Sequence, residues 1–271
     1  MAAGDLLSSI ELISPSEFAK KKVLSLQEYS ILAAQSVGNL FRKPLYVADM
    51  LQQADMIGFG SLPIVLSAVF FTGAALALNS ATTLSRFGAT TVIGQLVSIG
   101  IVRELGPVLA GLVVAGRNSS GMASELGSMI VTEQIDAMRA LGTDPIQKLV
   151  TPRLIATCVV LPLLTIIADF VGMFGGWVVA VLLVDVQGRL YWSTAWQALE
   201  WNDLTQGLLK PFVFAFVVAL VGCYYGLRAT GGTQGVGRAT TQAVVMASVL
   251  IFVLTFFLTR IFTSGLLAST P

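Results

Sequence analysis

Five long apolar segments restrict the fold of this chain more than any other feature of its sequence. A helix needs about 20 consecutive, mostly apolar residues to cross the hydrocarbon core of a bilayer. Five segments meet this requirement, namely 57–84, 89–115, 154–184, 211–227 and 239–259. The composition agrees, because 11% of the residues are charged, against about 25% in soluble domains. We therefore predict an all-α integral membrane protein with five transmembrane helices.

The lysines and arginines that flank these segments are distributed unequally. The N-terminus and the loops after the second and fourth spans carry Lys20, Lys21, Lys22, Arg42, Lys43, Arg117, Arg139, Lys148, Arg153, Arg228 and Arg238. The loops of the opposite side carry Arg86, Arg189 and Lys210. Because cytoplasmic loops are enriched in lysine and arginine, we predict a cytoplasmic N-terminus and, after five spans, a C-terminus on the opposite side.

The N-terminal segment differs from the rest of the chain. It contains no stretch apolar enough to span a membrane and no apolar core of a cleavable signal peptide. Apolar Phe18, Leu24 and Leu26 are mixed with the basic run 20–22, which is typical of a helix lying in the membrane interface. A soluble tail is the alternative. We predict an amphipathic interfacial segment at 1–55, on the cytoplasmic side, and a five-helix transmembrane domain at 56–271.

The loop between the second and third spans contains a short predicted helix at 133–141. Thr132 is a suitable N-cap, and Gly142 stands where a helix commonly ends. The helix carries acidic Glu133 and Asp136 in its first turn and an apolar stripe of Ile135, Met138 and Leu141. Such a helix either seals the cytoplasmic end of the bundle or inserts into a partner protein.

Two adjacent charged residues, Arg103 and Glu104, interrupt the second span. A charge at the centre of a span costs about 2.5–3.5 kcal/mol on insertion scales and usually has a function. The pair lies about 21 Å from Arg117 along a helix, which places it in the outer half of the bilayer. Pro107, one turn later, can kink the helix. We predict that both charges line a transport path or contact a partner above it. A structural ion-pair network is the alternative.

The sequence lacks the residues that catalysis and metal binding require. It has no histidine, and its two cysteines lie inside apolar runs, so we expect no metal site and no catalytic site. It also lacks the G-x-x-x-x-G-K-[ST] phosphate-binding sequence; the glycine-rich stretch 231–237 has no lysine and is predicted to be a turn. Any energy from ATP must therefore come from a separate subunit.

Several motifs give the chain a specific resemblance. They are Arg103 to Ala110, Ala115-Gly116-Arg117, Glu125, Glu133-Gln134, Asp144-Pro145, Pro152-Arg153 and Gly237 to Thr241. In order and spacing, these motifs resemble the MlaE/YrbE family of permeases over about residues 61–267. The resemblance implies a homodimeric, non-catalytic permease subunit of an ABC transporter. Two ATPase subunits, which use ATP and Mg²⁺, would bind its cytoplasmic face, and a ring of MCE-domain substrate-binding protein its outer face.

The resemblance also implies roles for residues. The helix containing Glu133, Ile135, Asp136, Met138 and Leu141 corresponds to the coupling helix that docks into the ATPase; from the helix geometry, we expect the acids to pair with basic groups and the apolar side chains to fill a groove. Lys210 matches a lysine near the family's substrate pocket. It either meets a lipid phosphate or extends towards the membrane interface.

The implied function is the transport of phospholipid, or of another hydrophobic molecule, between a bacterial inner membrane and the outer envelope, with a periplasmic C-terminus. Nothing indicates a nucleic-acid partner. An ATP-independent secondary transporter or channel is the alternative, although it would need buried proton or ion relays. A lipid-modifying membrane enzyme is a third class, and the sequence shows no residues arranged for its chemistry.

Overall fold

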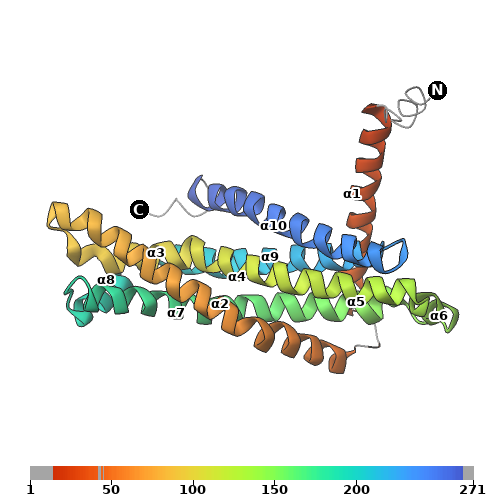
Figure 1. Ribbon diagram of the computed structural model, residues 1–271, viewed down its shortest axis with the longest axis horizontal. Coiled ribbons are helices and arrows are strands. Elements are labelled where there is room, and N and C mark those ends of the chain that lie inside the picture. Colours follow the sequence, from red (N-terminus) through yellow and green to blue (C-terminus); the bar gives the residue numbers. More distant parts are fainter. Residues whose placement is uncertain (1–14, 42–43, 45, 265–271) are drawn as a thin grey trace, which may run out of the picture.

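The computed structural model describes residues 15–41, 44 and 46–264, and almost all of them are helical (Figure 1). The helices, in order, are α1 (Pro15–Gly38), η1 (Asn39–Phe41), α2 (Val47–Leu84), η2 (Ser85–Phe87), η3 (Thr90–Val92), α3 (Ile93–Gly100), η4 (Ile101–Leu105), α4 (Gly106–Val114), η5 (Ala115–Ser119), α5 (Ser120–Val131), α6 (Gln134–Ala140), η6 (Ile146–Val150), α7 (Thr151–Leu182), α8 (Gly188–Gln197), α9 (Trp201–Gly226) and α10 (Gly232–Ser264). The described residues form no strand, so the predicted all-α fold is confirmed.

Five helical segments are long and apolar enough to cross a membrane, as predicted. They are Val47–Phe87, Thr90–Val131, Ile146–Leu182, Trp201–Gly226 and Gly232–Ser264. Each predicted span is shorter than the helical segment observed, because polar residues continue the helices. The first helix begins at Val47, so the expected domain boundary at 55/56 falls inside α2. The second continues to Val131, so Arg117 lies within the span. The fourth begins at Trp201, so Lys210 also lies within its span.

The second span is not a uniform α-helix. Two π-helical turns, η4 and η5, separate its α-helical parts α3, α4 and α5. The turn η4 directly precedes Gly106 and Pro107. Proline has no N–H group to continue the hydrogen-bond ladder, and single π-helical turns are frequent at functional sites. The expected irregularity at Pro107 is therefore present as a π-helical turn that holds Arg103 and Glu104.

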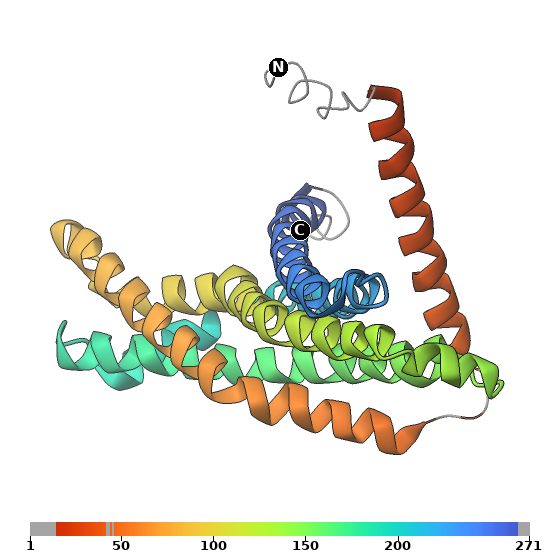
Figure 2. The same ribbon diagram turned by 45° about the vertical axis from the view of Figure 1, so that its right-hand side comes forward.

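The spans pack as a bundle in which α9 is central and α10 peripheral. In their most apolar windows, 61% of the α9 residues are buried but only 11% of those in α10. Helices α2 and α7 cross closely, since a Cβ atom added to Gly73 would lie 2.0 Å from the carbonyl oxygen of Gly172. Figures 1 and 2 show α4 and α5 between α2 on one side and α10 on the other.

Helix α1 runs across the direction of the bundle, beside its α6 end (Figures 1 and 2). An ion pair between Glu28 and Arg228 connects it to the loop after α9. Its apolar side chains Val23 and Leu26 are exposed, as expected of a helix that lies in the membrane interface. The side chains of the basic run 20–22 lie outside the described residues, as do residues 1–14.

Helix α8 packs against the opposite end of the bundle. Tyr191 is fully buried there, and its hydroxyl donates a hydrogen bond to the carbonyl oxygen of Met173 at 2.9 Å. Burial raises the pKa of the Tyr191 phenol, so it stays a neutral donor. This contact fixes α8 on α7.

Candidate functional site: a buried charge network

Four charged side chains meet between the second and fourth spans. Arg103 and Glu104 come from η4, and Asp203 and Lys210 come from α9. Arg103 forms an ion pair with Asp203. The Lys210 ammonium donates to Glu104 Oε1 at 2.6 Å. The side chains of Asp203 and Lys210 are fully buried, whereas those of Arg103 and Glu104 are 39% and 36% exposed.

The proline in the second span explains the position of Lys210. In an α-helix, the residue at position 107 would donate its N–H to the carbonyl of Arg103, but Pro107 has no N–H. The Lys210 ammonium donates to this carbonyl oxygen at 2.7 Å. One buried cation therefore satisfies both a free backbone carbonyl and the carboxylate of Glu104.

Asp203 has a double role that the sequence interpretation missed, since the fourth span was predicted to begin only at residue 211. Asp203 and Glu200 form a reciprocal capping box at the start of α9, in which each side chain accepts from the other's backbone N–H. Asp203 uses Oδ2 for the cap, at 3.1 Å, and Oδ1 for Arg103. The Glu-x-x-Asp spacing before an apolar run is the signal that could have identified this helix start.

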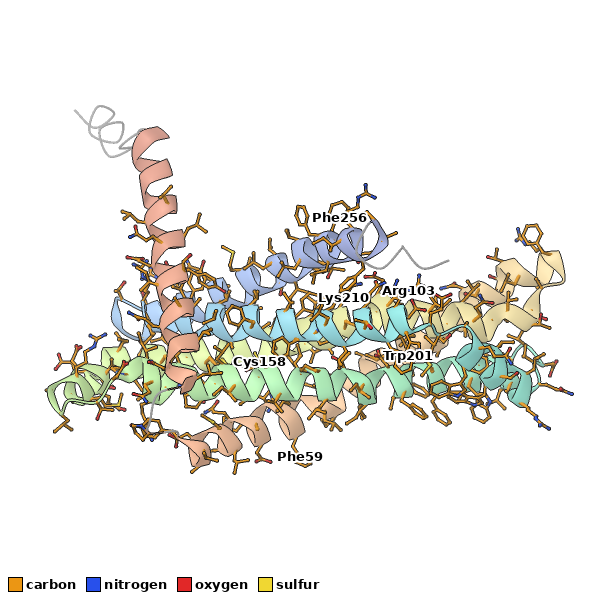
Figure 3. All side chains as sticks on the ribbon, turned by 180° about the vertical axis from the view of Figure 1, so that it is seen from behind. Phe59, Arg103, Cys158, Trp201, Lys210 and Phe256 are labelled. Carbon is orange, nitrogen blue, oxygen red and sulfur yellow. The ribbon has the colours of Figure 1, made fainter. Side chains whose placement is uncertain are left out.

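Glu104 is the member of the network that faces a groove. The groove has a volume of about 370 Å³ and is lined by Glu104, Leu105, Val108, Phe252, Thr255, Phe256 and Thr259. It lies between the second span and α10, and the Thr259 hydroxyl donates to Glu104 Oε1 at 2.8 Å. Figure 3 shows Arg103 and Lys210 between α9 and α10, which carries Phe256. An apolar groove thus ends at a carboxylate backed by a buried lysine.

The network bears on two alternatives left open by the sequence. A lysine that extends to the membrane interface is wrong for Lys210, because its side chain is fully buried. Arg103 and Glu104 do not pair with each other; each pairs with a residue of α9. The charges are therefore part of an ion-pair network, and Glu104 additionally borders the groove.

The predicted loop helix is present as α6. Its N-cap is Glu133, whose φ angle is +58°, and not Thr132, which ends α5. Its end agrees with the prediction: Gly142 has a φ angle of +78°, and its N–H donates to the Arg139 carbonyl at 3.0 Å. The N–H of Thr143 donates to the Met138 carbonyl at 3.0 Å, which completes a Schellman motif.

The apolar stripe of α6 is divided between two environments. Ile135 was predicted to enter a groove of a partner protein, and this prediction is wrong because Ile135 is fully buried within the chain. It anchors α6 to the bundle. Leu141 is 83% exposed, and Met138 is half-buried. Glu133 and Asp136 are exposed, and Asp136 pairs with Arg139 at 3.0 Å.

Polar contacts connect the segment after α6 to the start of the chain. The Asn39 amide donates to Asp144 at 3.4 Å. Lys148 forms an ion pair with Asp49, in the first turn of α2. These contacts link the loop that holds α6 to η1 and α2.

The fold and these paired charges define a polytopic helical membrane protein with a polar site inside its spans. Residues 50–261 match the family described as "Permease MlaE", so the chain belongs to the MlaE family of permeases. It is 44% identical to a probable ABC transporter permease protein of Rickettsia felis over 82% of this chain and 85% of the relative.

Two further relatives are more distant. The chain is 34% identical to the intermembrane phospholipid transport system permease protein MlaE of Haemophilus influenzae, over 72% of this chain and 76% of that protein. It is 37% identical to the chloroplastic protein TRIGALACTOSYLDIACYLGLYCEROL 1 of Arabidopsis thaliana, over 80% of this chain and 62% of that protein.

Proposed function

We propose that this chain is the membrane-spanning subunit of an ABC transporter that moves phospholipid, or another hydrophobic molecule, between a bacterial inner membrane and the outer envelope. Membership of the MlaE permease family and the name of the Haemophilus relative support this proposal. In the membrane, the basic end that carries α6 is cytoplasmic, the N-terminus lies on the same side, and the C-terminus is periplasmic.

The groove beside Glu104 is the observation that carries the proposal. Its walls include Phe252 and Phe256, which suit an acyl chain, and the carboxylate of Glu104 offers a polar contact for a headgroup. A site for an amphipathic molecule needs this combination of an apolar wall and a few polar groups. Lys210 acts from behind, as the group that holds Glu104 in position.

A second copy of the chain completes this site in our proposal. Helix α10 is the least buried span, and its Phe252, Phe256 and Phe257 are exposed by 58%, 67% and 56%. Packing of two α10 helices would cover these rings and enclose two grooves between the copies. An MCE-domain ring would then cover the periplasmic end of the shared cavity.

The ATPase contact belongs to α6 in this proposal. Exposed Glu133, Asp136 and Leu141, with half-buried Met138, form the docking surface, and Ile135 holds the helix to the bundle. The Asn39–Asp144 and Lys148–Asp49 contacts would transmit movement of α6 to α2. ATP and Mg²⁺ bind only to the ATPase subunits.

The experiment is purification of the tagged chain in nanodiscs, with ATPase activity and bound lipid measured on what copurifies. We expect an ATPase to copurify and lipid to be retained. Glu104→Gln should reduce lipid transfer between vesicles while leaving ATPase docking intact. Leu141→Asp should reduce ATPase docking, and nucleotide-dependent transfer with it, while bound lipid is retained. If the chain purifies alone, with no nucleotide-dependent transfer, the ABC assignment fails and an ATP-independent transporter or channel replaces it.

A further inference from the structure

One arginine inside the second span has no charged partner. Arg103 and Arg153, which also lie within spans, pair with Asp203 and Glu125. Arg117, in η5, is exposed, and within the described part of the chain no ion pair or hydrogen bond of its guanidinium is present. An unpaired cation in a span is expensive, and it usually marks a binding or transport site.

The guanidinium of Arg117 is held against the backbone of α2. A Cβ atom added to Gly60 would lie 2.0 Å from Nη1 and 2.4 Å from Nη2 of Arg117. Gly60 therefore provides the space that the guanidinium occupies. Beside Arg117, Cβ atoms added to Gly116 or Gly121 would meet no atom within 4 Å, so the surface around it is open.

The depth of this position in the membrane follows from α2. Asp55 is an exposed carboxylate on the same helix, so the cytoplasmic boundary of the hydrocarbon core lies on the Gly60 side of it. Gly60 is about 7.5 Å further along the helix. The headgroup region on each side of a bilayer is about 5–8 Å thick. The Arg117 guanidinium thus lies near the level where the phosphates and glycerol groups of the cytoplasmic leaflet are found.

Arg117 and the Glu104 groove lie on different sides of the second span. Arg117 leans towards α2, whereas the Glu104 groove lies towards α10, on the opposite side of the second span (Figures 1 and 2). Near Gly60, α2 presents exposed Met56, Phe59 and Ile64. Figure 3 shows Phe59 pointing away from the bundle. This face is apolar and suits contact with acyl chains.

From these observations, we propose that Arg117 binds the phosphate of a phospholipid in the cytoplasmic leaflet, with the acyl chains lying along the exposed face of α2. A guanidinium presents two parallel N–H donors to a phosphate, and basic positions between helices on the cytoplasmic side bind lipid headgroups. The phosphate supplies the counter-charge that the described part of the chain does not. This site is separate from the Glu104 groove and does not depend on the transport proposal.

Native mass spectrometry of the full chain, in the assembly in which it purifies, tests this proposal. Delipidated protein is titrated with phosphatidylglycerol and, separately, with inorganic phosphate. Arg117→Ala should raise the dissociation constant for phosphatidylglycerol about 10- to 100-fold, as expected for the loss of charge-assisted hydrogen bonds. Arg117→Lys should have a smaller effect, because an ammonium cannot form the bidentate contact.

Two variants serve as comparisons. Arg86→Ala removes another exposed arginine, in η2 just after the far end of α2, and should leave binding unchanged. Gly60→Ala should weaken binding severalfold, because the new methyl group takes the position of the guanidinium; it keeps the proposal testable if Arg117→Ala does not fold. Phosphatidylglycerol binding that survives both Arg117→Ala and Arg117→Lys would overturn the proposal. A changed mass of the intact assembly would also overturn it, because Arg117 would then be an interface residue. So would saturation of the site by inorganic phosphate at equal concentration.

Discussion

Removal of the buried lysine should destabilise the protein far more than removal of an exposed one. Lys210→Met deletes the ammonium that donates to Glu104 at 2.6 Å and to the Arg103 carbonyl at 2.7 Å, while keeping an apolar side chain of similar length. Breaking a buried ion pair costs about 3–5 kcal/mol. Glu104 is partly exposed and keeps its bond from Thr259, so we expect the lower end, about 3 kcal/mol.

Thermal unfolding in nanodiscs measures this loss. For a domain of this size, about 3 kcal/mol corresponds to a decrease in Tm of about 6–12 °C. The matched control is Lys148→Met, which breaks the half-exposed pair with Asp49 and should cost about 0–1 kcal/mol. The double variant Lys210→Met/Glu104→Gln should recover part of the loss, because it removes the unpaired carboxylate. Equal, small decreases in Tm for the two lysine variants would refute the reasoning.

Three further predictions follow from single contacts. Pro107→Ala, introduced into the Lys210→Met variant, should recover about 1 kcal/mol, because alanine supplies an N–H for the Arg103 carbonyl; the same unfolding assay measures it. Gly73→Ala should lower the yield of folded protein in size-exclusion chromatography, since its Cβ would lie 2.0 Å from a backbone oxygen, whereas Gly237→Ala has open space and should not. Leu141→Asp should preserve Tm but reduce the amount of copurified ATPase at least tenfold, as measured on a blot, because Leu141 is exposed. Ile135→Asp should reduce copurification and also lower Tm, because Ile135 is buried.

The charge network also explains why a charged sequence motif can lie in a span. A lone charge would be expensive in a bilayer, but each charge here has a partner on a neighbouring helix. Asp203 and Lys210 are fully buried against η4, and the more exposed Arg103 and Glu104 are held by them. The groove therefore receives one carboxylate in a fixed position, and the remaining charges act as its support.

The sequence by itself determined the number of spans and that each of them is helical. The bilayer core excludes unpaired backbone groups and most charges, so length and hydropathy alone predict a membrane helix. The glycine at position 142 also predicted the end of α6, where the N–H groups of Gly142 and Thr143 donate the two hydrogen bonds of a Schellman motif. These features depend on residues close together in the chain.

The tertiary structure alone decided which polar residues face each other. Arg103 and Asp203 are 100 residues apart, and Thr259 and Glu104 are 155 apart. A sequence shows that a helix is apolar but not how it is rotated against its neighbours. For this reason, the fourth span was predicted to begin too late, at residue 211, because Asp203 and Lys210 are buried between helices. The same rotation buries Ile135 and leaves Leu141 exposed, although both belong to one stripe.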